Sequence, residues 1–205
     1  MKIFKKIHYN TPVILTYALL SLLVLGISQL TAGKSDTLLF SVYRSPLTDP
    51  LTYVRMLGHV LGHANPYHYF NNFLLILLVG PILEEKYGSR QMLIMMLITS
   101  IITGAIFLLV SNNGVRLYGA SGIVFMMILL SSFVNLKRGR IPLTLILVII
   151  VYIGRELYEG ITTTDNISRL THVIGGLCGA VLGFYINKDK FGKDEKPLDE
   201  PAIDK

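Results

Sequence analysis

The stretch Tyr118-Gly119-Ala120-Ser121-Gly122 is a polar and glycine-containing break that opens a long apolar run of the chain. Flanking glycines let the backbone turn tightly and let other chain segments come close. Ser121 stands at the predicted head of a helix, where the first backbone N–H groups have no partner within the helix. An exposed hydroxyl beside such groups is the arrangement of a nucleophile with an oxyanion site. The competing interpretation is a set of small residues that pack helices in a membrane.

The composition indicates an integral membrane protein with an all-α fold. Of the 205 residues, 52% are hydrophobic and 16% are charged, and the polar residues are confined to short connections between apolar runs. The single cysteine, Cys178, excludes an internal disulfide and offers no metal cluster. The net charge of +6 falls between the apolar runs, so we interpret it as a topology signal and expect no nucleic acid partner.

Six apolar runs are predicted to cross the bilayer as helices. They cover residues 12–30, 66–83, 92–110, 121–133, 141–153 and 172–186. The first has no persuasive cleavage site and should remain as a helix. Residues 31–65 are too interrupted to span and too apolar for a soluble loop, so this first outer loop is expected at the membrane surface. The predicted protein is a polytopic bundle with a membrane domain at 12–187, preceded by a cytoplasmic N-terminus at 1–11 and followed by a charged, flexible cytoplasmic tail at 188–205.

The distribution of Lys and Arg predicts a multi-pass orientation in the cell membrane. If the N-terminus is cytoplasmic, 13 of the 19 Lys and Arg residues fall on the inner side and six on the outer side, in agreement with the positive-inside rule. Both termini are then cytoplasmic. The second, fourth and sixth spans run from outside to inside.

This shared direction allows the depth of polar residues in the membrane to be estimated. At about 1.5 Å per residue, Ser121 lies roughly 21 Å, and His172 roughly 22 Å, above the inner end of its own span. The same rise puts His68 roughly 24 Å and Asn72 roughly 18 Å above Glu84. Polar groups at one depth on three spans are costly unless they meet each other or water. We therefore expect a shared cavity that opens to the outer side.

His172 begins a stripe of small residues that continues with Gly175, Gly179 and Gly183. Glycines at helical spacing let another helix pack backbone to backbone, and His172 faces about the same way. If the fourth span is the partner, His172 meets Ser121 and can act as general base and then as general acid. The alternative is a histidine bonded to a carbonyl in a packed interface. No Asp or Glu lies within the predicted spans, so a Ser–His dyad is the simpler proposal.

Four further polar residues precede or begin the second span. His68 and Asn72 are four apart and project from one face, so they can offer N–H donors to a developing oxyanion; a polar helix contact without a catalytic role is the alternative. His59 and His63 are also four apart. With His68 they are candidate metal ligands, but the surface segment has no Cys or nearby carboxylate. We therefore expect neither a metal nor a cofactor.

Four motifs follow one another along these predicted spans: His59-x3-His63-x4-His68-x3-Asn72, Glu84-x-Lys86-x-Gly88, Gly119-x-Ser121-Gly122 and His172-x2-Gly175-x3-Gly179. In this order they closely resemble the rhomboid intramembrane serine proteases, over about residues 12 to 187. The second motif is similar to the family's Glu-x-Arg-x-Gly signature, with lysine in place of arginine. The resemblance implies a six-helix rhomboid-like bundle.

The resemblance also implies roles for individual residues. Ser121 is the nucleophile, His172 is the base, and His68 and Asn72 help to bind the oxyanion. The oxyanion and substrate-binding region includes Gly119 and Ala120. Phe125 is similar to an aromatic ring that packs on the histidine in the family. Supporting roles fall to Gly122, Phe125, Gly175, Gly179, His59, His63, Arg55, Glu84 and Gly88.

The chain departs from the family pattern at three positions. Val54 stands before Arg55 where members often have tryptophan, which affects lipid anchoring of the first outer loop. Tyr118 replaces a glycine of some members, and Thr171 replaces an alanine of many; neither change removes a catalytic group. By resemblance, the substrates are proteins with a membrane-spanning helix. They are cleaved near the outer end of that helix after local unwinding, with lateral access between the second and fifth spans.

Two other functions remain open at the level of sequence. A noncatalytic rhomboid-like protein would bind membrane clients, and this binding would not depend on Ser121. A histidine-based metal or ion transporter would use His59, His63, His68 and His172. The spans show no convincing transporter-like repeat and no buried carboxylate that could carry coupling ions.

Overall fold

The computed structural model is a bundle of helices, and it describes residues 9–112, 114–134, 143–162 and 166–188. In chain order the helices are α1 Pro12–Leu30, α2 Lys34–Leu38, α3 Pro50–Gly58, α4 Pro66–Tyr87, α5 Ser89–Val110, α6 Ser121–Ser131, α7 Leu143–Thr162 and α8 Asn166–Ile186. Among the described residues, the only β-type pairing is an isolated bridge between Val42 and Leu117. The all-α fold expected from the sequence is confirmed.

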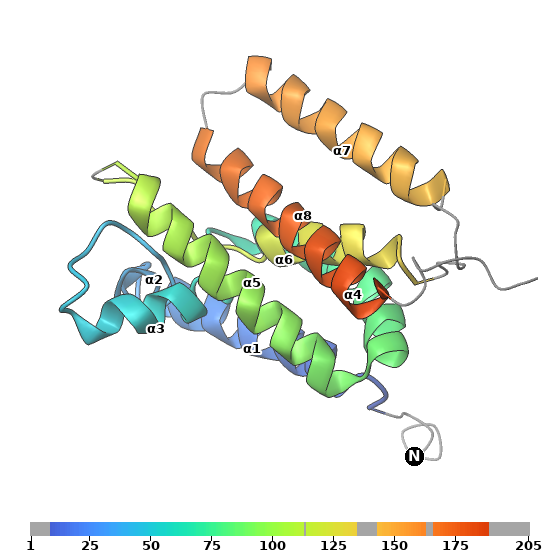
Figure 1. The fold of residues 1–205 in the computed structure, drawn as a ribbon. Helices are drawn as coiled ribbons and strands as arrows, with labels where there is room; N and C mark the ends of the chain where they lie inside the picture. Colours follow the sequence, from blue (N-terminus) through green and yellow to red (C-terminus); the bar gives the residue numbers. More distant parts are fainter. Residues whose placement is uncertain (1–8, 113, 135–142, 163–165, 189–205) are drawn as a thin grey trace, which may run out of the picture.

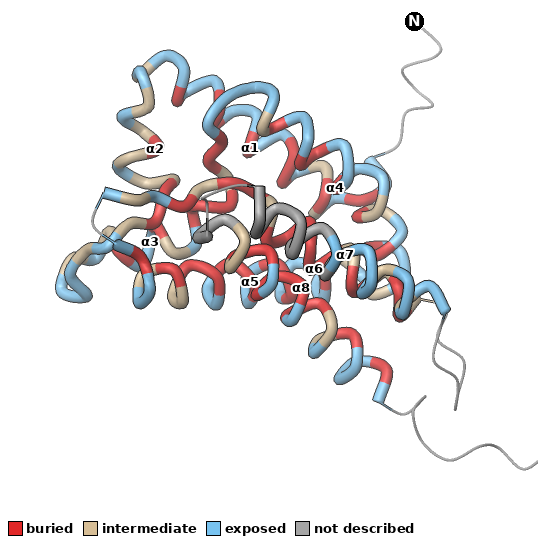
Figure 2. The backbone as a smooth tube through the Cα atoms, turned by 90° about the horizontal axis from the view of Figure 1, so that it is seen from above, coloured by how far each residue is buried: buried red, intermediate tan, exposed pale blue. Residues whose placement is uncertain are grey.

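Helix α6 is the central element of the bundle, packed against α4, α5 and α8 (Figure 1). Its residues from Gly122 to Met127 are all buried (Figure 2). A helix that is apolar all round is stable only inside a protein or a membrane, and its neighbours here supply that cover. Helix α7 lies at the edge of the bundle, where it contacts α6 and α8.

Several predicted helix boundaries are confirmed. Helices α1, α4 and α6 begin at residues 12, 66 and 121, as the sequence predicts. By length and composition, three of the described helices can cross a membrane: α1, α5 and the Arg169–Ile186 part of α8. Helix α6 is apolar but shorter. That six helices cross the membrane therefore stays a prediction.

Two predicted boundaries lie six or more residues from the helix boundaries. The sequence predicts that the fifth span ends at Ile153, but α7 continues to Thr162. It predicts that the sixth span begins at His172, but α8 begins at Asn166. Both differences have one physical cause. The predicted boundaries were set where the apolar composition ends, which is where the chain leaves the hydrocarbon, but helical hydrogen bonding can continue through polar residues beyond that point. His172 consequently lies within α8 and not at its head.

The glycine stripe of α8 packs directly on the backbone of α6. A Cβ atom added at Gly175 would lie 2.1 Å from the carbonyl oxygen of Gly122, and one at Gly179 would lie 2.2 Å from the carbonyl oxygen of Met126. Because no side chain fits at such distances, only glycine allows the two helices to approach this closely. The backbone-to-backbone packing predicted from the stripe is confirmed.

A buried carboxylate joins the end of α4 to the start of α1. Glu84 accepts hydrogen bonds from the backbone N–H groups of Val13 at 3.0 Å and Ile14 at 2.9 Å. It also accepts one from the Ser89 hydroxyl at 2.7 Å. The first N–H groups of a helix lack partners within the helix and carry partial positive charge, and the N-cap Thr11 makes no side-chain capping bond. Glu84 therefore caps α1 from another helix.

Gly88 completes the same end of the bundle. It closes α4 and precedes α5, and its φ of +84° lies in the left-handed region that favours glycine. Glu84 stands roughly 24 Å along α4 from His68. The signature residues Glu84 and Gly88 thus have structural roles at the opposite end of α4 from the serine turn.

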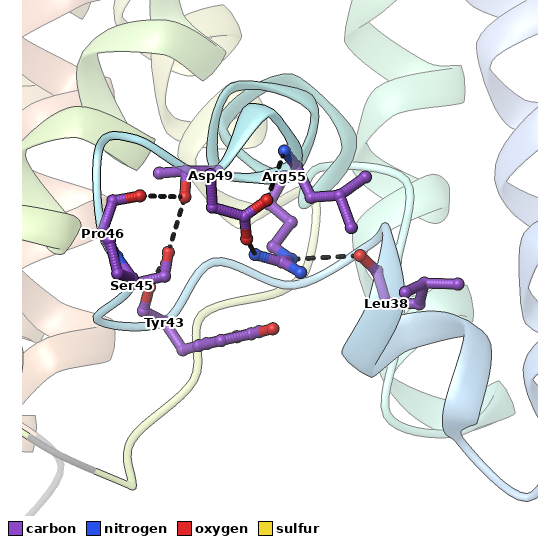
Figure 3. Close-up of polar contacts among 8 residues, drawn as sticks. Leu38, Tyr43, Ser45, Pro46, Asp49 and Arg55 are labelled. Carbon is purple, nitrogen blue, oxygen red and sulfur yellow. Dashed lines mark hydrogen bonds and ion pairs between the residues drawn. The ribbon is translucent and has the colours of Figure 1, made fainter.

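Arg55 organises the connection between α1 and α4 (Figure 3). Its Nη1 donates to Asp49 Oδ2 at 3.0 Å, and its Nε donates to the Leu38 carbonyl oxygen at 3.0 Å. Its Cζ lies 4.6 Å from the centroid of the Tyr43 ring. Arg55 is only 4% exposed, and a buried charge is tolerated when it is paired and hydrogen-bonded. Arg55 therefore holds α2, α3 and the segment between them together.

Gly179→Ala should destabilise the bundle, because the added methyl group has no room against α6 and overpacking costs roughly 1–3 kcal/mol. Gly26→Ala is the matched control, since no described atom would lie within 4 Å of its Cβ and alanine favours a helix. Thermal unfolding can be followed by a thiol-reactive fluorophore on Cys178, the single and buried cysteine. Equal unfolding temperatures for the two variants would contradict the close α6–α8 contact.

Glu84→Gln should lower the unfolding temperature, because one carboxylate oxygen becomes an NH2 group that cannot accept. Losing a charged cap and its hydrogen bonds costs about 2 kcal/mol. Glu85→Gln removes the same charge from the next, exposed residue and should leave the unfolding temperature almost unchanged. The same Cys178 assay measures both variants, and the assignment of Glu84 as a cap fails if their effects are alike.

Candidate active site

The turn before α6 requires glycine for two independent reasons. Gly119 has a φ of +130°, which side-chain-bearing residues rarely adopt. A Cβ atom added there would also lie 2.7 Å from Cε1 and 2.9 Å from Nε2 of His68, and 3.8 Å from Nδ2 of Asn72. Ser121 follows as the half-buried first residue of α6. The start of α4 and the serine turn are therefore in close contact.

Backbone hydrogen bonds tie this turn to the first outer connection. The Gly119 N–H donates to the His59 carbonyl oxygen at 2.9 Å. Val42 and Leu117 exchange two bonds, of 2.9 and 2.8 Å. Ala120 is fully buried. These contacts fix the backbone immediately before Ser121.

His172 faces the first turns of α6. Its ring centroid lies 4.4 Å from that of Phe125, with 36° between the planes. Phe125 follows Ser121 by four residues, which is about one turn of helix. The close contact between Gly122 and Gly175 lies at the same level. Ser121 and His172 thus belong to facing turns of α6 and α8.

The side-chain nitrogen of Asn72 has no hydrogen-bond partner among the described residues. The residue is 7% exposed, and its Nδ2 is buried. A buried donor without an acceptor costs about 1–3 kcal/mol, so its retention beside Gly119 calls for an explanation. The amide is available to donate to an oxygen atom at the Ser121 turn.

A family model described as the Rhomboid domain matches residues 50–189. The chain belongs to the rhomboid family. The match covers more than half of the chain and contains α3 to α8, and therefore the whole of the candidate site. Comparison with curated proteins gives no match. The rhomboid is thus an all-α membrane protein.

His59 and His63 of the rhomboid bind backbone carbonyl groups. His59 Nδ1–H donates to Met56 at 3.0 Å, and His63 Nδ1–H donates to Leu61 at 3.1 Å. The tautomers follow because a carbonyl oxygen can only accept. Among the residues that the structure describes, no three His, Cys, Asp or Glu side chains are grouped so that they could hold a metal ion.

His63 also packs against the start of α4. Its ring centroid lies 5.1 Å from that of His68, 5.5 Å from Tyr69 and 5.6 Å from Phe73. The contact with His68 is edge-on, with 62° between the rings. His63 therefore contacts the ring of His68 and the aromatic residues at the start of α4.

Thr103 of α5 is a site neighbour that the sequence analysis did not single out. Its hydroxyl lies 3.3 Å from His59 Nε2, and its Cγ2 would lie 3.3 Å from a Cβ atom at Gly122. A usable signal was present in the sequence. Thr99, Ser100 and Thr103 interrupt an otherwise apolar run at helical spacing, and polar groups on one helix face predict a polar neighbour.

Acidification should destabilise the connection before α4. Burial lowers the pKa of both His59 and His63 to about 4, and the positive field of His68 adds to the shift at His63. In the unfolded chain a histidine has a pKa near 6.5. Between about pH 6.5 and 4 the unfolded state binds more protons, so stability is complete above this window and falls as the pH falls.

We expect the unfolding temperature to be constant from pH 7 to 8 and to decrease between about pH 6.5 and 4. His59→Asn replaces the ring with a group that does not titrate, and should make this decrease shallower. A scan of unfolding temperature against pH for the two proteins measures the effect. Identical slopes would show that His59 is not buried in its neutral form.

Proposed function

We propose that this rhomboid is an intramembrane serine endopeptidase with a Ser121–His172 dyad. The carrying observation is the contact of α6 with α8, in which Gly122 meets Gly175 and the His172 ring packs on Phe125. A neutral imidazole on the turn facing Ser121 can take the hydroxyl proton while the oxygen attacks the scissile carbonyl carbon. It then returns that proton to the leaving amine, and the acyl-enzyme is hydrolysed by water.

The oxyanion of the tetrahedral intermediate would be held by N–H donors at the serine turn. The backbone N–H of Ser121 is one of the unpaired donors at a helix start. The buried Nδ2 of Asn72 and the ring of His68 lie against the same turn. Removing one such donor typically raises the activation free energy of the reaction by about 3 kcal/mol.

Family membership supports a proposal about the substrate class. We infer that the substrates are membrane proteins cut near the outer end of a transmembrane helix. Helix α4 presents the exposed apolar side chains of Tyr67, Phe70 and Leu74, and α7 lies at the edge of the bundle, so a path between α4 and α7 is the proposed lateral access. A helical peptide bond is shielded by its own hydrogen bonds, so helix-weakening residues should favour cleavage.

Covalent labelling by a fluorophosphonate tests the dyad directly. The purified, detergent-solubilised protein should be labelled, and Ser121→Ala and His172→Ala should each reduce labelling by roughly 1,000-fold or more. Ser131→Ala is the matched control, because it removes a hydroxyl from the far end of the same helix. It should be labelled like the wild type.

The unfolding temperature of each variant, measured on Cys178, separates loss of chemistry from loss of fold. Labelling that persists in Ser121→Ala would refute the nucleophile. If the folded wild type is neither labelled nor able to cleave a transmembrane reporter in liposomes, the protein is a noncatalytic rhomboid that binds membrane clients.

A further inference from the structure

A polar cavity of about 390 Å³ lies apart from the dyad, between the end of α1, α2 and the segment before Ser121. Its lining includes Ser28, Asp36, Thr37, Ser41, Arg116 and Tyr118. The volume falls within the range of small-molecule sites. The lining carries one acidic and one basic side chain, which is an unusual pair for an apolar protein.

Asp36 supplies the negative charge. Asp36 is 8% exposed. One carboxylate oxygen accepts from the Ser28 hydroxyl, and the other, Oδ1, is buried and has no partner among the described residues. The Ser41 hydroxyl donates to the Asp36 carbonyl oxygen at 2.7 Å and holds its backbone. Burial raises the pKa of Asp36, because it penalises the charged carboxylate. Rotation about the soft χ2 torsion can turn the unpaired oxygen toward the cavity.

Arg116 supplies the positive charge. Its Nη1 donates to the Thr37 hydroxyl, and its Cζ lies 5.7 Å from the Tyr43 ring centroid. The guanidinium is therefore already held beside the cavity by two contacts. It has five N–H donors in a planar fork, so donors remain for a bidentate contact with phosphate oxygens.

The cavity adjoins a surface suited to hydrocarbon. It lies at the end of α1, which is long and apolar enough to span a membrane. Leu22 of α1 is exposed and precedes the cavity-lining residue Gln29 by seven residues. A spacing of seven residues, about two turns, puts these two side chains on one face of the helix. A ligand with a charged head and an acyl chain can thus be accommodated by the cavity and this face together.

We propose that the cavity binds a phosphoethanolamine group, with its ammonium on Asp36 and its phosphate on Arg116. The membrane lipid phosphatidylethanolamine is the source that the exposed face of α1 favours. An ammonium group donates up to three hydrogen bonds, and one of them can go to the unpaired carboxylate oxygen of Asp36. A trimethylammonium group has no N–H and cannot do so. The proposal concerns lipid binding and stands independently of the proposed protease activity.

A basic side chain of a protein substrate is the competing occupant. It would satisfy Asp36, but it would also bring a second positive charge close to Arg116. A zwitterion uses both charges of the cavity, so the observed pair favours the lipid head group.

The test measures lipid affinity of the full-length, detergent-solubilised protein by native mass spectrometry. Short-chain phosphatidylethanolamine and phosphatidylcholine differ only in the methyl groups on nitrogen. We expect phosphatidylethanolamine to bind roughly 10- to 100-fold more tightly, which is the usual worth of a charge-assisted hydrogen bond. Equal affinities for the two lipids would overturn the proposal.

Substitutions at Asp36 and Arg116 test which residue binds the ammonium and which binds the phosphate of the head group. Asp36→Asn keeps an acceptor for Ser28 and removes the charge, so it should abolish the preference for phosphatidylethanolamine. Arg116→Gln should weaken both lipids alike, because both carry the phosphate. Arg44→Gln, a neighbouring exposed arginine outside the cavity lining, should change neither. The assignment of the ammonium to Asp36 and the phosphate to Arg116 would be contradicted by two results together. Asp36→Asn would still prefer phosphatidylethanolamine, and Arg116→Gln would bind both lipids as tightly as the wild type.

Two competition experiments identify the source of the ligand. In the first experiment, soluble glycerophosphoethanolamine competes with the lipid. If it displaces the lipid at a similar concentration, the head-group chemistry is supported, and the ligand is a free zwitterion and not the lipid. A lysine-containing peptide that binds in an Asp36-dependent manner, with no preference between the two lipids, would assign the cavity to protein substrates and overturn the proposal. The Cys178 unfolding assay checks that every variant is folded.

Discussion

The close contact between the backbones of α6 and α8 is the constraint on which the rest of this rhomboid depends. Gly175 and Gly179 leave no room for a side chain against the carbonyl groups of Gly122 and Met126. In a membrane there is no hydrophobic force between apolar helices, so dispersion contacts of this kind stabilise their association. The same contact brings the His172 ring onto Phe125. Packing and candidate chemistry therefore share one interface.

Buried charges fix the two ends of the bundle. At one end, the Glu84 carboxylate caps α1 and binds the start of α5. At the other, Arg55 joins Asp49 to the Leu38 carbonyl group. Each charge has several hydrogen-bond partners, which is the condition under which a buried charge is stable.

The candidate site contains both hydrogen-bonded and unpaired buried polar atoms. His59 and His63 donate through Nδ1 to carbonyl groups and hold the segment before α4, whereas His63 Nε2 and Asn72 Nδ2 have no partner among the described residues. Asp36 shows the same pattern at the separate cavity. Buried polar groups are nearly always paired in proteins, which supports the proposed external partners at Asn72 and Asp36.

The sequence by itself determined the helical class, the starts of α1, α4 and α6, and the residues of the dyad hypothesis, because hydropathy, caps and motif spacing are local properties. It misplaced the end of α7 and the start of α8, since composition reports contact with hydrocarbon and not helical hydrogen bonding. Only the tertiary structure decided that Glu84 caps α1, that Thr103 lies beside His59, and that Asp36 and Arg116 line one cavity. These contacts join residues far apart in the chain, and no local pattern encodes which distant partners meet.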